Sequence, residues 1–202
     1  HGSDSTEELL ANELDYEAMP HADFMNTLFS QNNPEKNKAF LYKPVLVCTI
    51  DHIIGATETK RGGKYILPSL RLLSSDLVID EVDDFNGQDL VAIARLVHLA
   101  GMLGRKVMIS SATIPPALAE GFFKAYQLGW QLYCKFKQLT NNNVIGMWVD
   151  EFSTQINLIT NDSGCSFIEN YKRVHQKFVG SRVKQLTKQV VKHKASIINC
   201  EH

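Results

Sequence analysis

The sequence predicts an α/β fold that contains a parallel sheet and continues into a C-terminal helical arm. Three short apolar runs, residues 44–49, 76–80 and 106–110, have the continuous hydrophobicity of strands that are buried on both faces. A segment with helical periodicity separates the last two runs, and a right-handed crossover through it makes those strands parallel. Polar residues follow both strands, so their carboxyl ends are expected at one edge of the sheet.

Composition sets few limits on function. The 202 residues are 44% hydrophobic, and 21 Lys and Arg nearly balance 22 Asp and Glu, which differs from the basic excess of small nucleic-acid-binding domains. No apolar stretch reaches the ~20 residues of a membrane span, and no signal peptide is recognisable. The cysteines lack the spacing of a zinc site or a disulfide framework: Cys48, Cys134, Cys165 and Cys200. We therefore expect a cytoplasmic protein.

The N-terminal region, residues 1–43, is predicted to be an acidic helix followed by a loop. Ser5 and Glu8 form a capping-box pattern at the start of a loosely periodic helix. Residues 30–38 are polar and contain a proline, which indicates a loop. The first 40 residues include eight carboxylates and only two lysines.

Residues 44–140 are predicted to be the main α/β unit. Asn86 is a suitable N-cap for the helix between the second and third strands, which extends to Gly101. Pro115 opens a second helix that is expected to end near Gly129.

Residues 141–202 are predicted to form two strands, at 144–152 and 155–160, and a long helix over 167–194. The helix has apolar positions on one face, and residues 171–194 contain eight Lys or Arg and no carboxylate. Six of these basic residues either line a DNA path or, as we favour, form a solvated helix face: Lys172, Arg173, Lys177, Arg182, Lys184 and Lys188.

Chemistry is indicated by the acidic box Asp80-Glu81-Val82-Asp83, which follows the second strand. Open α/β sheets bind ligands at the carboxyl ends of their strands. There Asp80 would hold Mg²⁺, usually through water, and Glu81 would polarise the water that attacks a terminal phosphate. Taken alone, the box also fits carboxylates that cap a strand end and begin a loop.

A second motif, Ser111-Ala112-Thr113, follows the third strand about one βαβ unit later. Its hydroxyls are expected beside the acidic box, where they could bond Asp83 and respond to the presence of a phosphate. Order, spacing and strand context together favour a site over ordinary loop chemistry.

The arrangement of strand, DExD box, helix, strand and SAT box resembles motifs II and III of superfamily 2 helicases. More segments are similar to the CRISPR-associated helicase-nuclease of type I-F systems: residues 47–52, 56–58, 61–63, 72–76, 80–85, 95–98, 110–113 and 115–118. The resemblance implies that residues 44–140 are part of a first RecA-like ATPase domain. Residues 141–202 would then lead toward a second motor domain.

What the resemblance implies about activity is specific. Such enzymes are recruited by a guide-RNA surveillance complex of the Cascade type to single-stranded DNA, which they pull with ATP and cut in a separate HD nuclease domain. Those of subtype I-F also associate with the CRISPR integrase. Carried over residue by residue, Asp80 would hold Mg²⁺ and Glu81 would activate water, so that both are catalytic and, with Asp83, form the ATP site. Asp83, Ser111 and Thr113 would couple hydrolysis to DNA movement.

Two further residues are candidates for DNA contact. The resemblance places Thr49 where the first motor domain touches the strand, although a buried or capping hydroxyl fits equally well. Arg61 and Lys64 flank two glycines in a basic loop that either grips phosphate or is solvated.

Other polar residues are interpreted without a functional role. His52 and His98 lack ligand-spaced partners and are expected in the core or at the surface. Asp150 and Glu151 imitate the acidic box, but no SAT-like strand follows, so they are interpreted as a strand end.

Several parts of a complete motor are missing. The chain has no GxxxxGK[ST] loop, no HD dipeptide and no arginine-rich box of a second motor domain. We therefore interpret it as a portion of a larger protein that is inactive alone. Two alternatives remain, another DExD helicase and a catalytically silent α/β interaction module.

Overall fold

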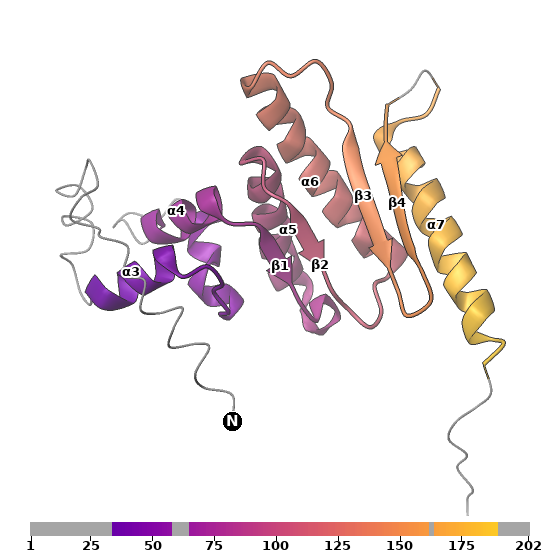
Figure 1. Ribbon diagram of the computed structural model, residues 1–202, viewed down its shortest axis with the longest axis horizontal. Coiled ribbons are helices and arrows are strands. Elements are labelled where there is room, and N and C mark those ends of the chain that lie inside the picture. Colours follow the sequence, from indigo (N-terminus) through magenta and orange to yellow (C-terminus); the bar gives the residue numbers. More distant parts are fainter. Residues whose placement is uncertain (1–33, 58–64, 162–163, 190–202) are drawn as a thin grey trace, which may run out of the picture.

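The computed structural model describes residues 34–57, 65–161 and 164–189 (Figure 1). Its centre is a strand-helix-strand unit in which α5 (Gly87–Met102) connects β1 (Leu77–Ile79) to β2 (Val107–Ile109). The two strands pair in parallel, with Leu77 opposite Val107 and Ile79 opposite Ile109. The predicted mixed α/β fold with a small parallel sheet is thereby confirmed.

Helix α5 begins where the sequence predicts. The side chain of Asn86 accepts hydrogen bonds from the backbone N–H groups of Gln88 and Asp89, which otherwise have no partner at a helix start. The helix then buries Ile93, Leu96, Val97 and Ala100 against the strands. Leu72 enters the same core from α4 (Ile66–Ser74), so helix and strands share one hydrophobic centre.

Helix α6 (Pro116–Phe136) extends well past Gly129, so the predicted helix end is wrong. Gly129 instead allows α5 and α6 to touch, because a Cβ there would overlap the carbonyl oxygen of His98 and lie 2.8 Å from the Met102 nitrogen. Gly101 serves the same contact from the other side, since its Cβ would lie 2.5 Å from the carbonyl oxygen of Tyr126. Both glycines are required by helix packing.

The predicted strand at residues 44–49 is absent, which is a second correction. The segment pairs with no strand in the described part of the chain, and Val47 is 91% exposed. A strand needs a neighbour to satisfy its backbone groups, and this segment has none among the described residues. The buried guanidinium of Arg71 instead holds the chain just before it, by donating to the carbonyl oxygens of Leu41 (2.9 Å) and Lys43 (2.6 Å). Two short 3₁₀ turns follow, η2 (Ile50–His52) and η3 (Ile54–Thr57).

The predicted loop at residues 30–38 is also wrong over its second half, which belongs to helix α3 (Pro34–Tyr42). The proline that suggested a loop occupies the first helical turn, where a missing N–H costs nothing and the fixed φ favours the helix. The helix predicted from Ser5 lies outside the described residues.

The C-terminal part is an antiparallel hairpin, β3 (Val144–Val149) and β4 (Thr154–Ile159), followed by α7 (Phe167–Leu186). Ser166 and Glu169 cap α7 reciprocally. The two predicted strands are confirmed, with a turn between them. The predicted helix is confirmed at its start, but it ends at Leu186 rather than at 194, where the Thr187 hydroxyl bonds the carbonyl of Lys184.

Aromatic contacts attach the hairpin and α7 to α6. The Tyr171 ring stacks on Phe123 of α6 with a centroid distance of 4.2 Å, and Trp148 of β3 packs against Tyr171 at 5.7 Å. The Trp148 Nε1–H donates to Nδ1 of His175 at 3.2 Å. Burial raises the pKa of Tyr171 to about 12 and lowers the pKa of His175. Both side chains are therefore neutral parts of the interface at pH 7.

No helix in the described residues is long and apolar enough to span a bilayer.

The glycine contact gives a stability prediction. Gly129→Ala should lower the free energy of unfolding by about 1–3 kcal/mol, because the new methyl group forces α5 and α6 apart. Urea unfolding measures this. Gly121→Ala on the same helix is the matched control, since a Cβ there meets nothing within 4 Å. It should stabilise by up to about 1 kcal/mol, and equal destabilisation by both variants would contradict this role of Gly129.

Candidate active site at the carboxyl edge of the parallel sheet

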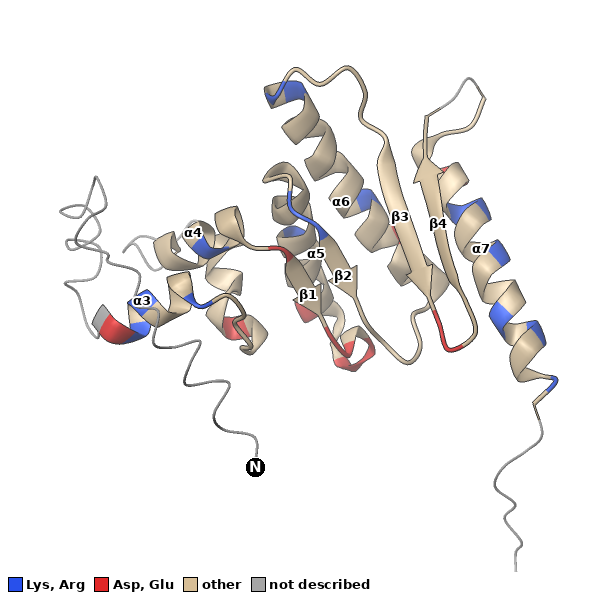
Figure 2. Ribbon diagram, in the orientation of Figure 1, with Lys and Arg blue, Asp and Glu red and all other residues tan. Residues whose placement is uncertain are grey.

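The carboxyl ends of β1 and β2 lie side by side, as the sequence predicts. Ile79 and Ile109 are register partners, and the Ser110 N–H donates to the carbonyl oxygen of Ile79 at 2.8 Å. Asp80 and Ser111 consequently leave the sheet at the same edge. Figure 2 shows this edge as an acidic turn at the lower end of the strands.

The acidic turn reverses direction at Glu81, whose backbone is left-handed with φ 52° and ψ 46°. This conformation is unfavourable for a residue with a Cβ. It allows the next residue, Val82, to enter the core, where it is fully buried, and begins the 3₁₀ turn η4 (Val82–Asp84). The reversal thereby directs Asp83 toward the end of β2.

Asp83 connects the two motifs. One of its carboxylate oxygens accepts a hydrogen bond from the Ser111 hydroxyl, and the other accepts from the Thr113 hydroxyl at 3.3 Å. These donors, Ser111 above all, hold the pKa of the Asp83 carboxyl below its usual range. The expected bonding of Asp83 to the serine and threonine is therefore present.

Asp80 and Glu81 are exposed, and their side chains make no hydrogen bond or ion pair within the part of the chain that the structure describes. Exposed carboxylates suit Mg²⁺, which commonly takes one or two of them together with waters and substrate phosphates. The same residues show no grouping of three His, Cys, Asp or Glu side chains around a metal position. Asp80 and Glu81 are thus open to solvent, and the Mg²⁺ and nucleotide binding expected of them stays a prediction.

Of the two predicted DNA-binding residues, the structure describes only Thr49. Thr49 is exposed, and its hydroxyl pairs with Nδ1 of His52 at 3.0 Å, just before η2. It is therefore accessible to a ligand. Arg61 lies outside the described residues.

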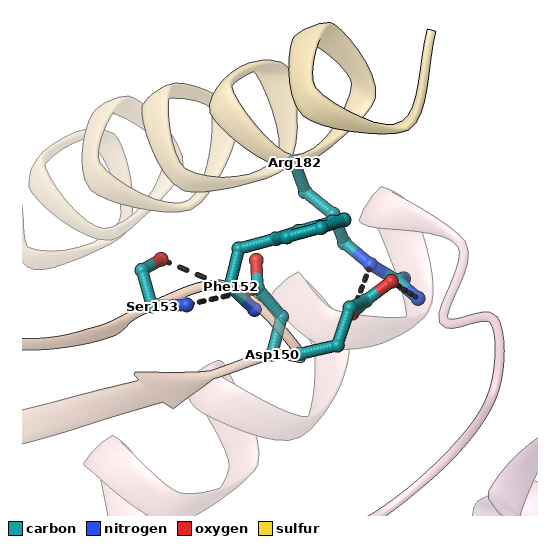
Figure 3. Close-up of polar contacts among 5 residues, drawn as sticks. Asp150, Phe152, Ser153 and Arg182 are labelled. Carbon is teal, nitrogen blue, oxygen red and sulfur yellow. Dashed lines mark hydrogen bonds and ion pairs between the residues drawn. The ribbon is translucent and has the colours of Figure 1, made fainter. Parts of the chain in front are cut away.

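Asp150 and Glu151 form the turn of the hairpin (Figure 3). The Asp150 carboxylate accepts from the backbone N–H groups of Phe152 (2.8 Å) and Ser153 (2.7 Å), which is a local turn contact. Glu151 receives two hydrogen bonds from Arg182, at 3.0 and 3.2 Å. The geometry agrees with a strand end and differs from that of the acidic box.

Two of the six basic residues of α7 are engaged in contacts with other elements. Arg182 binds Glu151 of the hairpin, and Lys172 pairs with Glu120 of α6 at 2.9 Å. These two side chains therefore attach α7 to its neighbours. Figure 2 shows basic residues distributed along α7. Lys177 and Lys184 of the helix are exposed, as is Lys188 in the turn that follows it.

Sequence reasoning missed the role of Arg71 and the left-handed backbone of Glu81. The signal for Arg71 was a single arginine within the apolar stretch of residues 66–73, since a charged group there must be paired or bonded to backbone. No pattern signalled Glu81, because its residue type gives no indication of a positive φ.

Comparison with known proteins gives two relatives. The chain is 40% identical over 194 residues to the CRISPR-associated nuclease/helicase Cas3 subtype I-F/YPEST of Pseudomonas aeruginosa, covering 92% of this chain and 17% of that protein. It is 45% identical over 150 residues to the protein of the same name from Pectobacterium atrosepticum, covering 73% of this chain and 13% of that protein. No protein-family model matches. The resemblance to type I-F helicase-nucleases is confirmed, for a segment that spans about a sixth of the first relative.

The bridge at Asp83 makes a testable electrostatic prediction. Ser111→Ala should raise the Asp83 pKa toward its ordinary value, and Thr113→Val should raise it less, since Ser111 is the larger cause. Carbon-13 NMR titration of the carboxyl reports both. Because the folded pKa is depressed, the stability from Asp83 is present above the unfolded pKa and is lost as pH falls through the folded pKa. An unchanged pKa in Ser111→Ala would contradict the bridge.

Proposed function

We propose that this chain, which matches a segment of the type I-F Cas3 nuclease/helicases, is part of the ATP-driven motor of a DNA helicase-nuclease that degrades foreign DNA in CRISPR interference. Residues 44–140 would belong to its first RecA-like domain, and residues 141–202 would lead toward the second. The observation that carries the proposal is Asp83, which joins the acidic turn after β1 to both hydroxyls after β2.

The proposed chemistry rests on Asp80 and Glu81, whose carboxylates have no partner among the described residues. Asp80 would hold Mg²⁺, through water, and the ion would neutralise charge on the phosphates of ATP. Glu81 would accept a proton from the water that attacks the terminal phosphate. The carboxylates are adjacent in sequence, so ion and water would be placed together.

Asp83 and the two hydroxyls support the coupling role. Ser111 and Thr113 lie at the start of the segment that enters α6, while Asp83 lies two residues from Glu81. A shift of the acidic turn on loss of the terminal phosphate would therefore be transmitted to α6 through two hydrogen bonds. Such bonds have two discrete states, made or broken, as a switch requires.

DNA contact is proposed for Thr49 and Arg61. The support for Thr49 is its exposure and the buried Arg71, which fixes the segment leading to it. Single-stranded DNA, a Cascade-type surveillance complex and the CRISPR integrase are the proposed partners, in the cytoplasm.

ATP turnover is expected of the longer protein of which this chain would be a segment. The chain has no glycine-rich phosphate loop, and the relatives are several times its length. The relevant measurement is therefore made on the complete enzyme.

Glu81→Gln in the complete enzyme should lower DNA-stimulated ATP hydrolysis by about 10²- to 10⁴-fold, the usual contribution of a positioned base. ATP binding should persist, because the amide keeps the size of the side chain. Glu151→Gln is the matched control, since that carboxylate serves the hairpin and Arg182. A Glu81→Gln enzyme with near-normal turnover would refute the assignment.

A further inference from the structure

The outward face of α6 carries an apolar stripe near its C-terminal end. Leu128, Leu132 and Phe136 follow at intervals of four residues, and Leu139 continues them just beyond the helix. All four are exposed, Phe136 at 81%. Contiguous apolar side chains at the surface mark docking sites more often than isolated ones do.

Lysines border the apolar stripe. Lys124, Lys135 and Lys137 are exposed and form no ion pair within residues 34–57, 65–161 and 164–189. The ammonium of Lys137 lies 5.8 Å from the centre of the Phe136 ring. An apolar strip with a basic border is complementary to an amphipathic helix that carries carboxylates.

The chain contains a sequence with that chemistry. Residues 5–19 include five carboxylates and no Lys or Arg, and Leu10, Leu14 and Ala18 recur at intervals of four. The sequence predicts a helix there, in which these three residues would form a ridge with the spacing of the apolar stripe. Ridges of i±4 residues on two helices interdigitate well. We propose that the apolar stripe of α6 is the docking site for residues 5–19 of the same chain.

A stretch of chain joins this segment to α3. Fourteen residues, 20–33, precede α3, and an extended chain of that length reaches about 45 Å.

The docking site lies away from the acidic turn. Helix α6 starts just after Thr113, at the carboxyl edge of the sheet, and runs toward the opposite edge, where Figure 2 shows its terminal lysines. The docked segment would therefore leave Asp80 and Glu81 open, and the inference is independent of the proposed ATP chemistry.

Carbodiimide cross-linking of the 202-residue chain tests the proposal, because the reagent joins an amine to a carboxylate in direct contact. Mass spectrometry should find Lys135 or Lys137 linked to a carboxylate of residues 5–19. The pairs Lys172–Glu120 (2.9 Å) and Lys38–Glu35 (3.8 Å) supply internal positive controls. Leu132→Asp should abolish the new cross-link and keep both controls.

Val183→Asp is the matched substitution, since Val183 is exposed on α7 to a similar extent, 52% against 48% for Leu132. It should leave the new cross-link intact. A mixture of isotope-labelled and unlabelled chains separates contacts within one chain from contacts between copies. Cross-links only between copies would overturn the proposal in favour of a dimer, and absence of the link while both controls form would also overturn it.

Discussion

The parallel register of β1 and β2 is the constraint on which the candidate site depends. Pairing of Ile79 with Ile109 brings Asp80 and Ser110 to one edge, and the following residues place Asp83 against Ser111 and Thr113. Because side chains alternate between the two faces of a sheet, a slip of one residue would send Leu77 and Ile79 out of the core. The hydrophobic core therefore fixes the register, and the register fixes the site.

Strain at Glu81 is the consequence of placing a carboxylate where the backbone favours glycine. A left-handed residue with a Cβ costs roughly 1–2 kcal/mol. Burial of the neighbouring Val82 and the two hydroxyl bonds to Asp83 offset that cost, since both require the chain to turn there. Burial of a valine side chain contributes about 1.5–3 kcal/mol, so the burial of Val82 is large enough to offset the strain at Glu81. Strained backbone positions of this kind cluster at functional sites, which supports the role proposed for Glu81.

The sequence predicted local features well and neighbour-dependent ones poorly. Asn86 caps its helix as predicted, and the acidic box contacts the Ser111-Ala112-Thr113 motif through Asp83 as predicted. Capping and the βαβ crossover are both set within a short segment of the chain. The strand predicted at residues 44–49 is absent, since a hydrophobic sequence does not by itself provide a neighbouring strand to pair with. Gly129 was taken for a helix end, because in sequence a glycine that ends a helix looks the same as one that lets another helix approach. The lone arginine at position 71 signals a bonded side chain, but its partners lie about thirty residues away and no pattern identifies them. The assignments of Thr49 and Arg61 stay predictions.

Although the net charge of the chain is near zero, negative charge is concentrated in the turn that would form the proposed site. The turn of residues 80–84 carries Asp80, Glu81, Asp83 and Asp84, all exposed, and only Asp83 has hydroxyl donors. No lysine or arginine is among these residues. The carboxylates repel an approaching nucleoside triphosphate unless a divalent cation lies between them and neutralises the negative charge. A bound cation is often the largest local charge in such a site. In the proposed function the turn would therefore act on a phosphate only together with a divalent cation such as Mg²⁺. The cationic groups that hold the rest of the nucleotide would have to come from outside the turn.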